Sequence, residues 1–380
     1  MTDAFTLRRP LAAILSSAAL AALALTAGPA MGQGALAPVA PTATPPAHPA
    51  PSEIVAAAPA TDWVAIPASD LLVMTLAPDP RGGAGRTGER RVIIQLMPAP
   101  FSQGWVANIR TLAAAHWWDG LAVTRVQDNY VAQWGDPDGE DPAKARALPA
   151  GLRVMGEADY AVPQSVAVET GILDETTSFW RQFYELFQSR EGMQQLMGPD
   201  GQLTSRRMPV FGWDNYGGSF HFFRGWPLSM TAREGTPGNY APVHCYGMVG
   251  VGRNMSPDTG SGAELYTVIG HAPRHLDRNI ALVGRVVEGI EHLSSLPRGT
   301  GPLGFYETPQ ERTTITSIRL ASELPDAEQP RMEYLSTESA SFARYAEARA
   351  NRRDPFFNIP AGGADVCNIP VPVRRVRAGG

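Results

Sequence analysis

The chain of 380 residues contains very little lysine and very little cysteine. Lys144 is its single lysine, and no stretch gathers basic residues into a block. With a formal net charge of only −5, the chain lacks the electrostatic footprint of a nucleic-acid-binding protein. Neither cysteine lies near residue 32, which excludes a lipid-anchored form. The length fits one large or two modest globular domains.

Long apolar runs are absent beyond residue 27. Arg8 and Arg9 precede an apolar run over 11–27, and small residues follow around residue 30, a pattern that indicates a cleaved export signal over 1–32. The run is shorter than the ~20 residues of a membrane span, and no charged stop follows it. We therefore expect a periplasmic or secreted protein with no stable membrane insertion once the signal is removed.

After the signal, the chain is at first almost uncharged and then becomes rich in predicted short strands. Residues 33–60 are Ala/Pro-rich, which is typical of an extended linker. "DLLVMTLA" and "RRVIIQLM" are β-rich runs, and helical spacing over "APFSQGWVANIRTLAAAHWWDGL" predicts a helix that ends at Asp119-Gly120. Three later runs, "HCYGMVGVGR", "GAELYTVIG" and "ALVGRVVEGIEHL", predict strands and a second helix. Together they favour a closed barrel with capped ends.

The order of these segments resembles the cyclophilin family of peptidyl-prolyl isomerases. "WWDGLAVTRV" is similar to the family's Y-D-G-x-x-F-H-R-V segment, and "YVAQWGD" is similar to its F-x-x-Q-G-G-D segment. "DTGSGAELYTVIGHAPRHLDRNIALVGRVVEG" resembles its N-T-N-G-S-Q-F-F-I strand, its W-L-D turn and its closing F-G-x-V-x-x-G. The resemblance covers roughly 160 residues in two blocks, a normal single-domain size.

The resemblance implies a site without metal or cofactor. Arg125 matches the family's catalytic arginine, and the implied partners are proline-containing unfolded or folding polypeptides. The family's proline-pocket positions match Tyr130, Val131, Tyr266 and Leu276. Its polar substrate-holding positions match Gln133 and Glu264, and His275 matches a position at the rim. Several of these depart from the family. Val123-Thr124 replaces Phe-His, Glu264 replaces a glutamine, His275 replaces a tryptophan, and the last rim histidine falls near Ile280.

The implied fold is mainly β: a cyclophilin-like closed eight-stranded antiparallel barrel capped by two helices, with an irregular or helical insertion. The expected division is signal 1–32, linker 33–60, first barrel block 61–137, insertion 138–240, second barrel block 241–325 and C-terminal extension 326–380.

In the insertion, an aromatic face over 174–198 predicts a helix that packs on the barrel. We expect the loop 212–228 to extend one wall of the proline groove and to tune which polypeptides enter.

Other interpretations come from short motifs. "DTGS" at 258–261 is also an aspartic-protease signature, but loop composition precedes it and no second copy occurs. His271 and His275 have a zinc-like spacing that Pro273 interrupts, and Cys245 beside His244 lacks a partner triad. For Cys245 and Cys367 the sequence allows two interpretations: a disulfide between them, or two separate buried thiols. A chaperone or binding module with weak or lost catalysis is the alternative to an isomerase.

Overall fold

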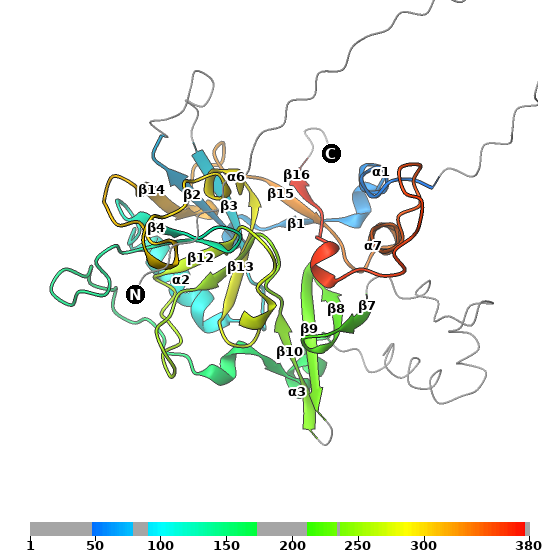
Figure 1. The fold of residues 1–380 in the computed structure, drawn as a ribbon, viewed down its shortest axis with the longest axis horizontal. Helices are drawn as coiled ribbons and strands as arrows, with labels where there is room; N and C mark the ends of the chain where they lie inside the picture. The colour runs from blue at the N-terminus through cyan, green and yellow to red at the C-terminus, as the bar shows by residue number, and fades with distance from the viewer. Residues whose placement is uncertain (1–47, 79–89, 173–210, 234–235, 377–380) are drawn as a thin grey trace, which may run out of the picture. The chain divides into compact units, whose positions relative to one another are not determined.

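The computed structural model in Figure 1 describes residues 48–78, 90–172, 211–233 and 236–376. At its centre is a closed antiparallel barrel with the strand order β11-β12-β5-β4-β14-β2-β3-β13. The strands of the barrel are β2 (Leu71–Leu76), β3 (Arg90–Leu96), β4 (Ala122–Val126), β5 (Val131–Gly135), β11 (Met248–Val251), β12 (Leu265–Val268), β13 (Leu282–Glu288) and β14 (Thr313–Leu320). All of them come from the two segments predicted to form it.

Strands β2 and β3 are buried on both faces, which explains their nearly continuous apolar sequences. Leu72 and Ile94 belong to the large core that fills the barrel, whereas Val73 and Ile93 pack on the other side against Met332. Successive side chains of a strand point to opposite faces. A strand with cover on both faces therefore shows no polar alternation.

Two helices cap the barrel, but they differ greatly in length. Helix α2 (Gln103–Ala114) buries Trp105, Ile109 and Leu112 and packs on β13 and β14. Helix α6 (Glu291–Ser294) is a single turn against β3. Among the described residues, no helix has both the length and the apolar character that a bilayer crossing requires.

The C-terminal extension forms a second layer outside the barrel. Strands β1 (Trp63–Ile66), β15 (Met332–Leu335) and β16 (Val373–Arg375) make a three-stranded sheet, visible in Figure 1 between the barrel and helices α1 (Pro51–Ala56) and α7 (Ala340–Ala350). Strand β1 thus belongs to this sheet and not to the barrel, although it lies in the first predicted barrel block.

The prediction of an extended linker over 33–60 is wrong for residues 51–60. Pro51 begins helix α1, a position where the missing N–H of proline is not needed. Ile54 and Ala58 are then buried against Phe342 and Tyr345 of α7. The packing partner lies near the opposite end of the chain, so the Ala/Pro composition alone could not reveal it.

The insertion contains a five-stranded antiparallel sheet in the order β6-β10-β9-β8-β7, drawn in green in Figure 1. Its strands are β6 (Val162–Pro163), β7 (Phe211–Asp214), β8 (Gly218–Phe223), β9 (Trp226–Arg233) and β10 (Thr236–Pro242), and the short helix α3 (Gln164–Glu169) adjoins them. The expectation of an irregular or helical insertion missed this sheet, and the predicted loop 212–228 is two hairpins within it. The helix predicted over 174–198 lies outside the described residues.

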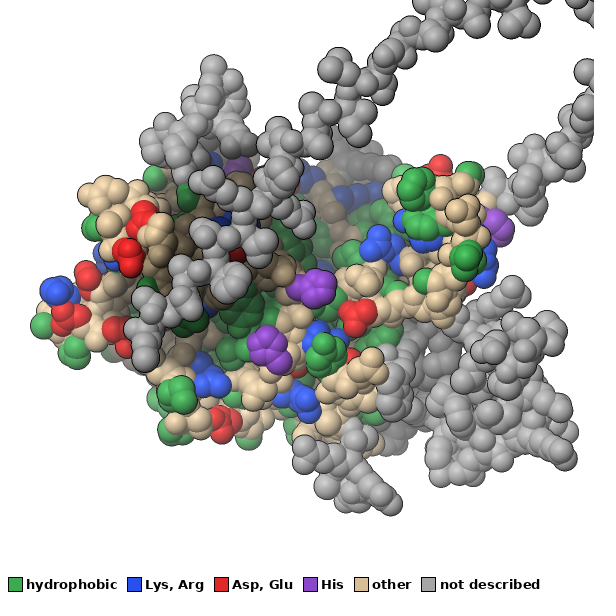
Figure 2. Space-filling view, viewed as in Figure 1, with side chains coloured by type: hydrophobic (Ala, Val, Ile, Leu, Met, Phe, Trp, Pro, Cys, Tyr) green, Lys and Arg blue, Asp and Glu red, His purple; other side chains and the backbone are tan. Residues whose placement is uncertain are grey.

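The surface is mixed in character on the face shown in Figure 2. Acidic, basic and apolar side chains of the described residues alternate there over short distances. This distribution matches the low net charge of the whole chain.

Cys245 and Cys367 form a disulfide that ties the C-terminal extension to the residues just before β11. The bond spans 122 positions of sequence, so it strongly restricts the unfolded chain. We expect Cys367→Ser to lower the free energy of unfolding by ~2–4 kcal/mol. Urea denaturation of the oxidised wild type and the variant checks this. Wild type reduced with dithiothreitol serves as the control and should match the variant; equal stability of all three would contradict the prediction.

Candidate active site

Arg125 projects from β4 beside strand β5, where the register of the two strands shifts. The shift falls between Val123 and Arg125 and sets Arg125 opposite Gln133. Such irregularities re-aim a side chain relative to a regular ladder. The guanidinium donates from Nη1 to Oε1 of Gln133 over 3.1 Å and from Nη2 to Oε1 of Gln127. Partial burial lowers the pKa of Arg125, yet a guanidinium stays charged at physiological pH.

A chain of hydrogen bonds continues from Arg125 through Gln133 to Glu264. The Gln133 amide, which accepts from Arg125, donates from Nε2 to Oε1 of Glu264 over 2.5 Å. Glu264 directly precedes β12, and burial raises the pKa of its carboxyl. The amide of Gln133 thereby has a fixed orientation, with its oxygen towards the cation and its nitrogen towards the carboxylate.

An apolar patch lies next to these polar groups. Its buried base is Val131, Tyr266 and Val268, from the paired strands β5 and β12. Tyr130, Leu276 and Ile280 are partly buried and pack against this base. The structure thus brings together all four residues predicted for a proline pocket, and adds Ile280 beside them.

Tyr266 is held in place by a buried histidine. Its hydroxyl lies 2.8 Å from Nε2 of His244, whose Nδ1 lies 2.8 Å from Oδ1 of Asp277. Burial raises the pKa of Tyr266 well above its usual value, so the phenol stays protonated. With Cys245 in a disulfide, His244 has no thiol neighbour to activate, and its role is to fix the base of the apolar patch.

The rim of the apolar patch is the turn Pro273–Asp277, which includes the short 3-10 helix Arg274–Leu276. His275 is exposed on this turn and stacks on Tyr130, with ring centroids 6.4 Å apart and an interplanar angle of 12°. Leu276 faces the patch. His275 therefore extends the aromatic surface of Tyr130 at this edge of the patch.

The competing motifs have structural roles. The Asp258 carboxylate accepts backbone N–H bonds from Asn254 and Gly260, over 2.8 and 3.0 Å, and so holds its own loop together. His271 and His275 do not share an α-helix, because only a three-residue 3-10 helix begins at Arg274. Across the described ranges, no group of three His, Cys, Asp or Glu side chains is placed to hold a metal.

A model of the family "Cyclophilin type peptidyl-prolyl cis-trans isomerase/CLD" matches residues 87–320. The chain belongs to this family. Among solved structures, cyclophilin AquaCyp293 from Hirschia baltica aligns with a TM-score of 0.53 and 18% identity, over 82% of this chain and 93% of that one. A cyclophilin type peptidyl-prolyl cis-trans isomerase from Cryptosporidium parvum aligns with a TM-score of only 0.33 and 9% identity, over 66% of this chain and 96% of that one. No curated protein matches the chain.

The comparisons confirm the predicted family and the cyclophilin-like barrel. At 18% identity the Hirschia structure shows the fold alone, so the roles of individual residues in this cyclophilin rest on their own geometry. Where the family has Phe-His before its arginine, Val123 is fully buried and Thr124 donates from Oγ1 to the Gln133 carbonyl over 3.4 Å. The replacement by smaller residues is accommodated within the barrel wall.

Sequence reasoning missed three residues that contact Arg125. Gln127 lies only two positions from Arg125 in the sequence, so this contact could have been predicted. Leu303 and Phe305 come from a segment after α6: the Leu303 carbonyl accepts from Nε of Arg125 over 2.7 Å, and the Phe305 ring lies 5.2 Å from the guanidinium carbon. No sequence pattern signals a contact between positions so far apart.

Glu264 gives this cyclophilin a pH-dependent group at the site. Its folded-state pKa is raised above the ordinary value of 4.5, chiefly by burial. Such a carboxyl favours the protonated folded state, so stability is full below the unfolded pKa and falls as pH rises through the folded pKa. We expect Glu264→Gln to be more stable than wild type at pH 7 and equally stable below pH 4.5. Thermal melts from pH 4 to 8 check this; a stability difference that does not change with pH would contradict it.

Proposed function

We propose that this cyclophilin catalyses cis-trans isomerisation of X-Pro bonds in exported polypeptides, with Arg125 stabilising the twisted imide. The observation that carries the proposal is the juxtaposition of one fixed guanidinium and one apolar patch. Arg125 lies 5.6 Å from the ring of Tyr130, and that ring covers the buried residues Val131 and Tyr266. The cation and the patch are thus close enough to act on one residue of a substrate.

The reaction needs nothing beyond these groups. Rotation about an X-Pro bond must break the partial double bond of the imide, a barrier of ~18–20 kcal/mol, while the two end states differ by only about 0.5–1 kcal/mol. In the twisted state the imide nitrogen regains a lone pair that accepts a hydrogen bond. A fixed donor therefore binds the transition state more strongly than either ground state, which is the condition for catalysis.

Each part of the site has a place in this mechanism. The apolar patch accepts the proline ring, and the amide of Gln133, oriented by Arg125 and Glu264, offers a polar group for the substrate backbone. The N–H groups on Nη1 and Nη2 of Arg125 supply the donor to the twisted nitrogen. His275 extends the aromatic surface of Tyr130 at the rim.

Export to the periplasm or to the medium is part of the proposal. The predicted signal over 1–32 lies outside the described residues, so the support comes from elsewhere in the chain. The Cys245–Cys367 disulfide fits an oxidising compartment, because such bonds rarely persist in the cytosol.

The test is the isomerisation rate of short peptides of the form Ala-X-Pro-Phe, measured by NMR exchange with X varied over apolar, polar and charged residues. We expect acceleration that saturates with peptide concentration. The same preparation should speed the proline-limited refolding of an exported protein. No acceleration for any X would remove the isomerase assignment.

A second candidate is a binding module that retains the fold with weakened catalysis. It is favoured by the sheet of the insertion, which enlarges the surface beside the rim: Arg278 donates from Nη1 to Thr231 of β9 and from Nη2 to the carbonyl of Tyr216. An aggregation-suppression assay on an unfolded client separates the two functions. Suppression without isomerisation would favour the binding module.

A further inference from the structure

The segment Gly299–Tyr306 follows the edge of β4 on both sides of Arg125. The N–H of Tyr306 donates to the Thr124 carbonyl over 2.9 Å, and the N–H of Gly299 donates to the Val126 carbonyl over 2.9 Å. Phe305 forms an isolated antiparallel bridge with Arg125 itself. The segment is therefore bound to the strand that carries the proposed catalytic residue, and its position relative to Arg125 is fixed by backbone hydrogen bonds.

Between these two anchor points the chain turns tightly against β4. Leu303 has φ +56° and Gly304 has φ +80°, values that residues other than glycine rarely adopt. A Cβ at Gly304 would lie 2.7 Å from the Val126 carbonyl oxygen and 2.7 Å from Cα of Gln127. Only glycine fits at this point. The tight turn directs the Leu303 carbonyl at Nε of Arg125, over 2.7 Å.

The Phe305 ring also lies close to the same guanidinium. Its centroid lies 5.2 Å from the guanidinium carbon, and the Tyr130 ring lies at 5.6 Å, both within the range of cation–π attraction. An aromatic ring attracts the cation through its π face and does not accept hydrogen bonds from the N–H groups in the plane of the guanidinium. Phe305 thus restrains Arg125 while leaving the η N–H groups to the amides and to a substrate.

We infer that Phe305, together with the Leu303 carbonyl, is a positioning residue for Arg125. The inference rests on the proposed function, in which Arg125 is the group that acts on the imide. The carbonyl fixes the rotation of the guanidinium about its side chain, and the ring fixes its tilt. The η N–H groups then point to one place beside the apolar patch, as a preorganised donor must.

The first test compares Phe305→Ala, Phe305→Leu and Phe305→Trp in the peptide isomerase assay. We expect the alanine and leucine variants to lose about two- to fivefold in kcat with little change in KM, the rate equivalent of one exposed cation–π contact. The tryptophan variant should retain wild-type kcat, because it keeps a π face. Phe356→Ala, at a phenylalanine 84% exposed in the C-terminal extension, is the control and should leave kcat unchanged.

A double variant separates positioning from other effects of the ring. In the Arg125→Ala background, Phe305→Ala should cause no further loss of kcat, because the group that it positions is gone. An equal loss in both backgrounds would overturn the inference. So would a leucine variant as active as the wild type, since apolar bulk without a π face would then be enough.

The second test does not depend on activity. The Arg125 Nε–H signal in ¹⁵N NMR spectra is the one that disappears in Arg125→Lys. In Phe305→Ala, solvent exchange of this proton should be severalfold faster than in wild type. Unchanged exchange would overturn the inference whatever happens to kcat. If the wild type accelerates no peptide, the proposed function fails on its own, and the exchange rate still decides whether Phe305 holds the guanidinium.

Discussion

Arg125→Ala is expected to fold normally and to lose about a hundredfold in isomerase rate, which corresponds to roughly 3 kcal/mol of activation free energy. The substitution leaves Tyr130, Val131 and Tyr266 in place, so KM should change little. The interaction that disappears is the charge-assisted hydrogen bond to the twisted imide, which is made only in the transition state. The cis-to-trans rate of one Ala-Pro peptide, together with a thermal melt, measures both quantities.

Two further variants make the result specific. Arg125→Lys should recover only part of the rate, because a flexible ammonium cannot reproduce the planar fork. Arg352→Ala is the matched control: Arg352 also stacks on a phenylalanine, with its guanidinium carbon 4.3 Å from the Phe357 ring, but belongs to the C-terminal extension. It should leave the rate unchanged.

The alternative for Arg125 is a surface ion pair, whose loss would cost under about 1 kcal/mol of stability and leave the rate alone. Within the described part of the chain, no carboxylate lies within 4.0 Å of its guanidinium, whereas Arg298 has such a pair with Asp128 at 2.9 Å. Arg125 instead binds two amides and a carbonyl. A well-folded Arg125→Ala with wild-type activity would remove the catalytic assignment.

The barrel could be predicted from the sequence because its individual strands follow local patterns and because the order of the motifs resembles a known family. Its strands are short apolar runs between turn residues, and the pairing of β5 with β12 places Gln133 opposite Tyr266. Once the two motif segments are recognised, the gathering of Arg125, Gln133 and Glu264 follows from strand register. The family resemblance supplied the order of the motifs, and the structure supplied the register.

Some of the parts that sequence missed are local, such as the hairpins β7–β8 and β8–β9, and others depend on contacts between distant segments. "GWDNYGGSFHFFRGWPL" contains four glycines and few aliphatic residues, so it looked like a loop, yet Phe220 and Trp226 lie in β8 and β9. Helix α1 exists because Ile54 has α7 to pack against. The Leu303 carbonyl reaches Arg125 across 178 positions of sequence. No local pattern encodes such contacts.

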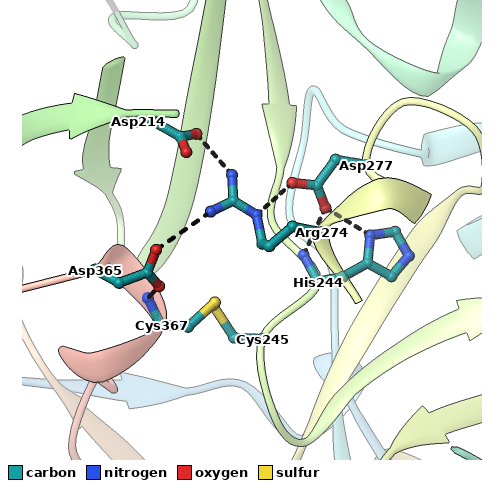
Figure 3. The surroundings of a disulfide bond; sticks show 7 residues. All are labelled: Asp214, His244, Cys245, Arg274, Asp277, Asp365 and Cys367. Atoms are coloured by element: carbon teal, nitrogen blue, oxygen red, sulfur yellow. Dashed lines mark hydrogen bonds and ion pairs between the residues drawn. A yellow bond between two sulfur atoms is a disulfide. The ribbon is translucent and has the colours of Figure 1, made fainter. Parts of the chain in front are cut away.

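An ion network around the buried Arg274 joins the insertion, the rim turn and the C-terminal extension (Figure 3). Arg274, only 4% exposed, donates from Nη2 to Asp214 and from Nε to Asp277, each over 2.6 Å, and its Nη1 lies 3.8 Å from Asp365. Asp365 in turn accepts from the N–H of Cys367. One guanidinium therefore connects β7, the rim turn and the segment that carries the disulfide.

The charge states in this network depend on one another. Burial by itself would raise the pKa of Asp277, but hydrogen bonds from His244 and Arg274 outweigh it, and the pKa is lowered. Oδ1 of Asp277 accepts from the backbone N–H and lies beside Nδ1 of His244, while Oδ2 accepts from Arg274. The buried carboxylate is thus stable as an anion only while its donors remain.

Arg274→Ala is expected to lower the free energy of unfolding at pH 7 by about 3–5 kcal/mol, because it leaves Asp214 and Asp277 buried without their cation. The control is Arg375→Ala, which breaks the exposed pair with Glu288 at 2.5 Å and should cost under about 1 kcal/mol. Urea denaturation of both variants measures the two losses. Equal losses would show that the buried network contributes no more than a surface pair.

The pH dependence of that loss distinguishes an unpaired charge from a simple packing defect. In wild type the lowered pKa of Asp277 contributes stability that is present above its unfolded value and lost as pH falls. Without Arg274, only His244 opposes the effect of burial, so the pKa of the same carboxyl should rise above its unfolded value and the variant should lose stability as pH rises. The wild-type loss falls below the ordinary pKa of 3.8, so between pH 4 and 7 only the variant changes, and the two proteins converge on acidification. We expect the difference at pH 7 to shrink steadily towards pH 4; a constant difference over this range would mean that a cavity, and not the two carboxylates, accounts for the loss.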